Sequence, residues 1–404
     1  MTISIRKYHI IFFALLFLTS CAGLNSRKIA QTEIQQAQQQ VPEEELLDIG
    51  IMVFESEEIT EKQSKKEGTN PEVRKAENHF VSYHLKNTLE RSGHWGMVRV
   101  TPLESESADV LIKGGIVESN GENLVVAITV SDSAGNVWLK EKYKATVTEG
   151  AYKDNVSGEK DIFQGLYNAI ANDMTNYRKK MNPEKIKEIR AVTQLKFARY
   201  FAPHAFEGYL EESKKNTFTL KRLPADNDTM MARILESRER VYMFEDTINE
   251  YYEGFYNEMW APYEEWRKLN LTERIALNAQ KRSAFLRQAG GAMLVALGVM
   301  MEVQDVHDSA ILTGGLVIIG GQVFLSGLNI SKQAQMHYET LEELGESFGS
   351  EMKPVVLEFE GKKYELTGTA EEQYKRWKEI LHQMYYVETG FLPPESPEQN
   401  DSQE

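Results

Sequence analysis

The single cysteine constrains this 404-residue chain most, because it removes every intramolecular cross-link from the fold. Cys21 has no second cysteine to pair with, so a disulfide and a cysteine-rich metal cluster are both excluded. The fold must therefore be held by non-covalent packing. A chain of this length can bury real hydrophobic cores, and it predicts two or three domains.

The first 21 residues have the layout of a secretory leader. A basic pair, Arg6-Lys7, precedes an apolar run of about eight residues, too short for a bilayer span of ~20 residues. The run ends in Leu18-Thr19-Ser20-Cys21, which resembles the lipobox of bacterial lipoproteins. The resemblance implies a signal peptide over residues 1–20, cleavage before Cys21 and acyl chains on Cys21. The alternative is a free thiol in an ordinary leader.

The residues after Cys21 bear on its destination. Enterobacterial lipoproteins kept in the inner membrane usually carry an aspartate directly after the lipidated cysteine, and here Ala22 and Gly23 follow. By resemblance to that rule, we expect an outer-membrane lipoprotein that faces the periplasm and is attached to the membrane through the lipid on Cys21. The formal net charge of −15 argues against nucleic acid as a partner and against charge-driven docking on anionic lipid.

Residues 21–46 are expected to form a lipidated tether. The segment is rich in glutamine and glutamate and has few apolar residues to bury, which is typical of a disordered linker. Such a coil would span roughly 25 Å on average. A short helix over Ile29–Gln40 is the competing interpretation.

Residues 47–180 show the pattern of an α/β unit. Apolar runs predict strands at residues 49–54, 97–100, 110–117, 124–130 and 137–147, and helical spacing predicts helices at 73–89 and 162–174. Pro71 suits the start of the first helix and Gly93 its end. We expect a glycine bulge at Gly114-Gly115 and a tight hairpin turn at Asn120-Gly121.

The predicted order of this unit, β-α-β-β-β-α, resembles the amino-terminal domain of the translocation protein TolB and related domains of the curli-secretion lipoprotein CsgG. The resemblance rests on Gly50–Phe54, on Leu85–Leu89 before Gly93, and on Ala108–Gly114. It implies a binding and assembly module without an active site. CsgG's membrane-spanning β-hairpins have no recognisable counterpart here, which argues against a curli-type pore.

Residues 181–288 are predicted to be mainly helical and highly charged. One apolar stripe runs from Ile186 to Phe197, and a second helix is expected to start near Asp228-Thr229. Pro262 is expected to interrupt that helix, and Thr272 to open a third one. An aromatic cluster on this region is a candidate partner surface, with a helix–helix core as the alternative: Tyr251, Tyr252, Phe255, Trp260 and Trp266.

Residues 289–330 form a predicted glycine-rich apolar helical hairpin with arms at 289–301 and 310–328. Its small residues would let helices approach closely, as they do in membranes. Both arms are shorter than the ~20 residues of a confident span. The interpretations are a tightly packed core hairpin, a membrane or homo-oligomer contact, and a hinged element that switches between them. The candidate contact glycines are Gly290, Gly291, Gly298, Gly314, Gly315, Gly320, Gly321 and Gly327.

The remaining chain predicts a helix, a β-hairpin and a helix over residues 331–390, and a loose tail over 391–404. Thr369 with Glu372 forms a capping box for the last helix. The expected fold class is therefore α+β: the N-terminal β-α-β-β-β-α domain, then a mainly α-helical region with the glycine-rich hairpin, then the C-terminal β-hairpin plus helix.

The search for chemistry finds no catalytic constellation, cofactor motif or metal motif in the sequence. His204 is interpreted as a packed or capping residue, His307 as part of a solvated turn, and Glu245-Asp246 as a solvated acidic face. We expect no enzyme and no cofactor, but a scaffold or assembly component of a cell-envelope complex that contacts other envelope proteins. The alternatives are an oligomeric pore or export channel built on residues 289–328, and an envelope hydrolase.

Overall fold

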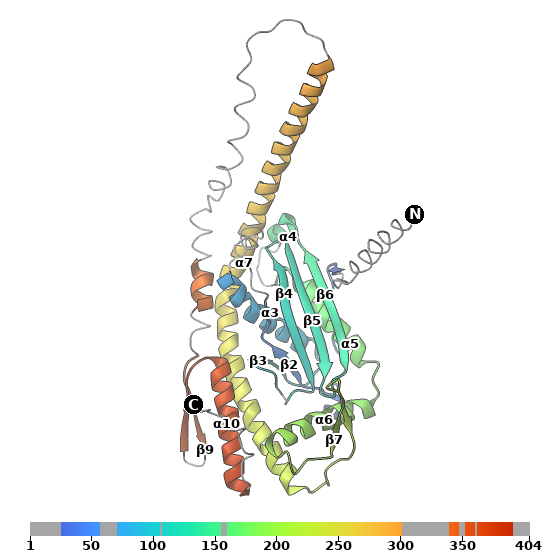
Figure 1. The fold of residues 1–404 in the computed structure, drawn as a ribbon, viewed down its shortest axis with the longest axis vertical. Coiled ribbons are helices and arrows are strands. Elements are labelled where there is room, and N and C mark those ends of the chain that lie inside the picture. The colour runs from blue at the N-terminus through green and yellow to red at the C-terminus, as the bar shows by residue number, and fades with distance from the viewer. Residues whose placement is uncertain are drawn as a thin grey trace, which may run out of the picture.

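The computed structural model describes residues 26–56, 71–105, 107–154, 160–300, 339–346, 352–359 and 362–390. The fold is α+β, with an N-terminal sheet domain followed by a helical region (Figure 1). This confirms the predicted fold class.

A six-stranded sheet with the order β1-β6-β5-β4-β2-β3 organises the first half of the chain. Its strands are β1 (Arg27–Ile29), β2 (Ile49–Met52), β3 (Val98–Thr101), β4 (Val110–Ser119), β5 (Asn123–Asp132) and β6 (Val137–Thr146). β2 pairs in parallel with β3 and β4, β1 pairs in parallel with β6, and β4, β5 and β6 form an antiparallel meander. The sheet is therefore mixed, with its long strands in the meander.

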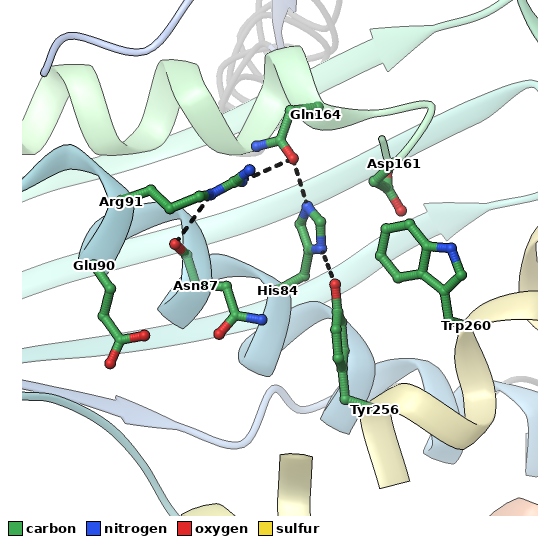
Figure 2. Close-up of a pocket in the computed structure, with 8 residues that line it drawn as sticks. All are labelled: His84, Asn87, Glu90, Arg91, Asp161, Gln164, Tyr256 and Trp260. Atoms are coloured by element: carbon green, nitrogen blue, oxygen red, sulfur yellow. Dashed lines mark hydrogen bonds between the residues drawn. The ribbon is translucent and has the colours of Figure 1, made fainter. Parts of the chain in front are cut away.

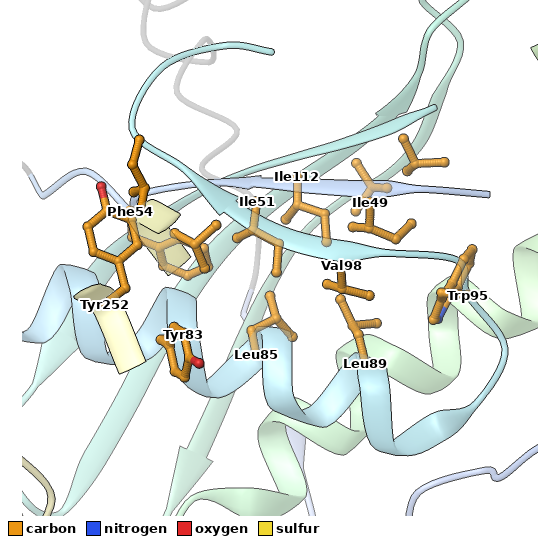
Figure 3. Packing of buried hydrophobic residues seen from close by; sticks show 14 of the residues in the cluster. Ile49, Ile51, Phe54, Tyr83, Leu85, Leu89, Trp95, Val98, Ile112 and Tyr252 are labelled. Atoms are coloured by element: carbon orange, nitrogen blue, oxygen red, sulfur yellow. The ribbon is translucent and has the colours of Figure 1, made fainter. Parts of the chain in front are cut away.

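Helices cover one face of this sheet. They are α3 (Pro71–Ser92) and α5 (Gln164–Arg178), while the short α4 (Glu149–Asp154) follows β6 and contacts α7 (Thr229–Met300). Ile49 and Ile51 of β2 and Val98 of β3 meet Leu85 and Leu89 of α3, and all five side chains are buried (Figure 3). The helical spacing on α3 and the alternation on β2 are the physical basis of this core.

The predicted elements of the sheet domain are largely confirmed, with two corrections. All five predicted strand segments are present as β2 to β6, so four strands lie between α3 and α5, one more than the predicted order β-α-β-β-β-α counted. The β4 bulge falls between Ile116 and Glu118 and not at Gly114-Gly115. Gly114 has a different function: a Cβ there would collide with the ring of Phe54. Gly93 and Gly121 adopt the expected left-handed conformations, with φ of 69° and 77°.

The segment expected to be a flexible tether is packed against the body from Arg27 onwards, so neither the coil nor the helix prediction holds there. β1 extends the sheet, and a one-turn helix follows at η1 (Glu43–Glu45). Asn172 of α5 accepts a hydrogen bond from Gln35 N and donates one to Glu33 O, both at 2.8 Å. Because these partners lie about 140 residues away, no local pattern could reveal them.

The helical region contains one very long helix. α6 (Pro183–Phe201) buries the predicted stripe, and a small hairpin of β7 (Leu210–Glu212) and β8 (Phe218–Leu220) leads to α7 (Thr229–Met300). Asp228 accepts hydrogen bonds from Met230 N and Met231 N at 2.9 Å, which confirms the predicted start. The expected break at Pro262 and the expected new helix at Thr272 are wrong, because α7 continues through both.

The C-terminal elements pack back onto α7. β9 (Val355–Phe359) and β10 (Lys362–Leu366) form the predicted hairpin, and α10 (Ala370–Thr389) begins with the predicted capping box. Trp377 of α10 is buried and donates to Arg240 O of α7 at 3.1 Å. One apolar core runs from Leu47 to Tyr385, so packing is continuous across the expected boundary between residues 180 and 181.

Candidate functional site

A surface cavity of about 320 Å³ opens where α3, α7 and the start of α5 meet (Figure 2). α3 supplies His84, Asn87, Glu90 and Arg91, α7 supplies Tyr256 and Trp260, and the α5 side supplies Asp161 and Gln164. The lining is polar on most sides, with one aromatic wall. It brings titratable side chains from three elements together beside an aromatic wall, and we take it as the candidate site.

A hydrogen-bond network at the cavity fixes the tautomer of His84. Gln164 Nε2 donates to Thr88 and Asn168, so its Oε1 faces His84 and accepts from Nε2–H at 2.9 Å. His84 Nδ1 is then the acceptor, and the hydroxyl of Tyr256 donates to it at 2.7 Å. Burial is the main reason that the pKa of His84 lies below its ordinary value, so the ring is neutral near pH 7.

This network limits what His84 can do chemically. Its lone pair is already occupied by Tyr256, so a substrate proton would have to displace that hydroxyl. Arg91 adds a second hydrogen bond to Gln164 Oε1 at 3.0 Å. The cavity therefore presents satisfied polar groups beside the Trp260 ring, an arrangement that suits binding or the joining of helices better than proton transfer.

A buried ion pair lies beside the cavity. Arg267 of α7 donates to Asp161 at 2.8 Å, and both side chains are almost completely buried. Burial by itself would raise the pKa of Asp161, but the Arg267 guanidinium outweighs it and holds the pKa below its usual value. A Cβ at Gly121 would collide with Arg267 O, so the tip of the β4–β5 hairpin touches α7 at this point. The pair joins α7 to the segment just before α5, next to the contact of the hairpin with α7.

A second buried carboxylate overturns one sequence interpretation. Glu245, expected on a solvated acidic face, is buried, and its Oε1 accepts from Ser105 and Tyr374 at 2.9 Å and from Ser107 at 3.3 Å. Burial raises its pKa. Its neighbour Asp246 remains half-exposed and pairs with Arg99 at 2.6 Å. The partners of Glu245 lie at least 129 residues away in the sequence, which is why periodicity missed it.

The aromatic cluster predicted as a partner surface is part of the core. Tyr252, Phe255 and Trp266 are buried, and Tyr251 and Trp260 are partly buried. Trp260 lies 5.8 Å from the ring of Phe80 on α3, measured between centroids. The cluster thus forms the helix–helix core that was the alternative, because α7 lies along α3.

The predicted membrane or oligomer glycines fall at the edge of the described chain. Gly290, Gly291 and Gly298 lie on the helical backbone of α7. Gly314, Gly315, Gly320, Gly321 and Gly327 lie outside the described residues, as does the lipidation candidate Cys21. Among the helices that the structure describes, none has both the length and the apolar character of a membrane span.

The histidines are spread over different parts of the described ranges. His204, expected to be a packed or capping residue, is exposed and so is not packed, and His307 lies outside the described residues. His79 is buried against Tyr252 and Phe255, and burial lowers its pKa to about 4. Over the described residues, no group of three His, Cys, Asp or Glu side chains could hold a metal ion.

Comparison with known proteins identifies no relative of this chain. No family model, curated protein or solved structure matches the chain. The function must therefore be argued from the molecule itself.

Proposed function

We propose that this protein is an outer-membrane lipoprotein, attached through Cys21 and facing the periplasm, that acts as a non-catalytic scaffold in a cell-envelope complex. The observation that carries the proposal is the long helix α7. Its 72 residues correspond to a length of about 110 Å at 1.5 Å per residue. Figure 1 shows its second half extending well past the end of the sheet.

The first half of α7 is locked to the body by buried polar contacts. Tyr256 bonds His84, Tyr263 donates to Glu77 at 2.7 Å, and Asn249 donates to Val100 O at 3.0 Å while accepting from Val100 N at 2.8 Å. Asn249 thereby pairs with the free edge of β3 as a neighbouring strand would. Such contacts give the helix a fixed direction relative to the body.

The second half of α7 leaves that packing. After Leu271, none of the described side chains is buried, and Ile275 is 42 % exposed. The 29 residues from 272 to 300 extend on the order of 40 Å beyond Leu271, the last position of α7 that the structure describes as buried. A rigid base with a projecting helix suits a protein that holds partners at a distance from its own anchor. The binding and assembly role implied by the TolB and CsgG resemblance supports the same proposal.

The test is site-specific photocrosslinking in cells. A photoreactive residue at exposed Asn278 on the projecting part should capture a defined envelope protein, and the same residue at exposed Lys215 on the β7–β8 turn is the matched control. The Cys21→Ser chain should lose both acylation and the adduct. Repeated failure of Asn278 to yield an adduct, or equal capture from Lys215, would contradict the scaffold proposal.

A pore or export channel remains the second candidate. It is favoured by the apolar sequence of residues 289–300 at the far end of α7. Adducts between two copies of this chain, in place of another protein, would support it. If the Cys21→Ser chain is a monomer without detergent, the pore candidate fails.

A further inference from the structure

The face of the sheet opposite α3 and α5 is open. In Figure 1 the side of β4, β5 and β6 turned to the viewer carries no helix. Tyr143 of β6 points to α5, where its hydroxyl donates to Asp173 at 2.8 Å. Side chains alternate along a strand, so the residues on either side of Tyr143 point to the open face.

Four lysines on adjacent strands gather on this face. β6 contributes Lys140, Lys142 and Lys144 at every second position, and β1 contributes Lys28, which is paired in register with Lys144. We call these four residues the lysine row. Lys28, Lys140 and Lys142 form no ion pair with any described residue, and Lys144 lies 3.7 Å from Glu118. Like charges directly opposite each other on neighbouring strands are destabilising. The pairing of Lys28 with Lys144 is therefore expected to lower the stability of the folded state.

The row is also close to the proposed anchor. β1 begins at Arg27, six residues after Cys21, and six residues of chain reach at most about 21 Å. Arg27 fixes that strand, because its guanidinium pairs with Asp173 at 2.5 Å. A lipid on Cys21 would thus hold the lysine row near the headgroups. The expected flexible tether would have permitted a larger separation.

We propose that the lysine row docks the open sheet face on the anionic phospholipid headgroups of the bilayer that holds the lipid on Cys21. This inference rests on the proposed lipid anchoring. Juxtamembrane lysines attract anionic leaflets at short range. The net charge of −15 argues against docking by the chain as a whole, but it does not exclude docking by this one face. Charges farther than about 8 Å from the headgroups are largely screened at physiological salt. Lys142 and Lys140 pair in register with the partly exposed Ala127 and Thr129 of β5, and long lysine stems can lie over such neighbours while the charged heads face outward.

The test uses the complete lipidated chain in vesicles. Cys21 is the only native cysteine, so Val117→Cys places a unique thiol on β4 of this sheet, where Val117 is 50 % exposed. A polarity-sensitive dye at this position should shift to the blue in vesicles containing phosphatidylglycerol and not in phosphatidylcholine. The same dye on Lys215→Cys should not shift. The triple variant Lys140→Glu, Lys142→Glu, Lys144→Glu should reduce the docked-to-undocked ratio about tenfold or more.

The controls separate docking from folding and from anchoring. Lys187→Glu, Lys214→Glu and Lys375→Glu change the same number of exposed lysines elsewhere and should leave the shift intact. If the triple variant misfolds by circular dichroism, the corresponding Lys→Gln variant should still weaken the shift. Flotation with the vesicles tests the lipid anchor separately: a chain that does not float contradicts the proposed anchoring.

Three outcomes would overturn the docking proposal for a chain that does float. One is an equal blue shift in neutral and anionic vesicles. Another is no shift in either. The third is a triple variant that keeps the vesicle shift but loses capture of an envelope protein, which would assign the lysine row to a protein partner.

Discussion

Asp109 joins three parts of the body through one buried carboxylate. Oδ2 accepts from Asp48 N at 2.9 Å, and Oδ1 accepts from Thr193 Oγ1 of α6 at 2.7 Å. Asp109 belongs to the run Ala108–Gly114 on which the resemblance to TolB rests, so its structural role is now defined. It connects the start of β2 to α6.

Asp109 should also make the unfolding free energy depend on pH. Burial, as the largest cause, raises its pKa from 3.8 to about 6, so the folded state binds the proton more tightly than the unfolded state. Its contribution is present below pH 4 and is lost as the pH rises through 6. The difference between the two pKa values corresponds to about 3 kcal/mol.

The measurement is urea unfolding of wild type and Asp109→Asn between pH 4 and pH 7. The advantage of the wild type over the variant should fall by about 2 kcal/mol across this range, most of the full difference, because asparagine does not titrate. Asp226→Asn, at an exposed position, is the control and should show no such trend. A constant difference between wild type and Asp109→Asn would contradict the assignment.

At the scale of the element, Pro262 is the clearest conflict between local propensity and the fold. Proline in a helix interior removes one backbone donor and clashes with the preceding turn. α7 continues nevertheless, because Met259, Tyr263 and Trp266 around it are buried against the body. Tertiary packing thus outweighs the local preference.

Pro262→Ala should therefore raise the unfolding free energy. The gain from the restored helix is partly offset by the larger entropy of the unfolded chain, which leaves about 1–2 kcal/mol. Chemical denaturation measures it, with Glu258→Ala at an exposed position one turn earlier in α7 as the control for introducing alanine. A lower stability in Pro262→Ala would mean that the packing of Tyr263 and Trp266 requires the proline.

At the scale of the whole molecule, the C-terminal helix and the sheet share one core. Trp377 of α10 lies 6.1 Å from Phe244 of α7, measured between ring centroids, and α7 contacts β3. We therefore expect α10 and the sheet to unfold together. Chains of this size often unfold through intermediates. An intermediate that keeps the sheet folded after α10 has unfolded would contradict this expectation.

Hydrogen exchange tests this cooperativity. Trp377→Ala should lower the unfolding free energy by about 3–5 kcal/mol. It should accelerate the slowest amides of β5 as much as those of α10, although β5 is far away in the sequence. Val387→Ala, at an 83 % exposed position on α10, should change neither. Unaltered exchange in β5 would show that α10 unfolds separately from the sheet.

The helices and strands with strong periodicity could be predicted from the sequence because each depends on its own residues. α3, the β4–β5 turn and the α10 capping box are of this kind. The edge strand β1 and the continuity of α7 could not be, because distant residues supply their partners. The candidate cavity was missed for the same reason, since His84 and Tyr256 are 172 residues apart.

The sequence by itself determined the absence of disulfides, the α+β class and the local starts and ends of most elements. The tertiary structure decided which polar and aromatic residues are buried. It placed Glu245 and the 251–266 aromatics inside, and it brought four lysines of an acidic chain together on one open face. The physical reason is that propensity and periodicity act over a few residues, whereas burial and charge clustering depend on which distant segments the packing joins.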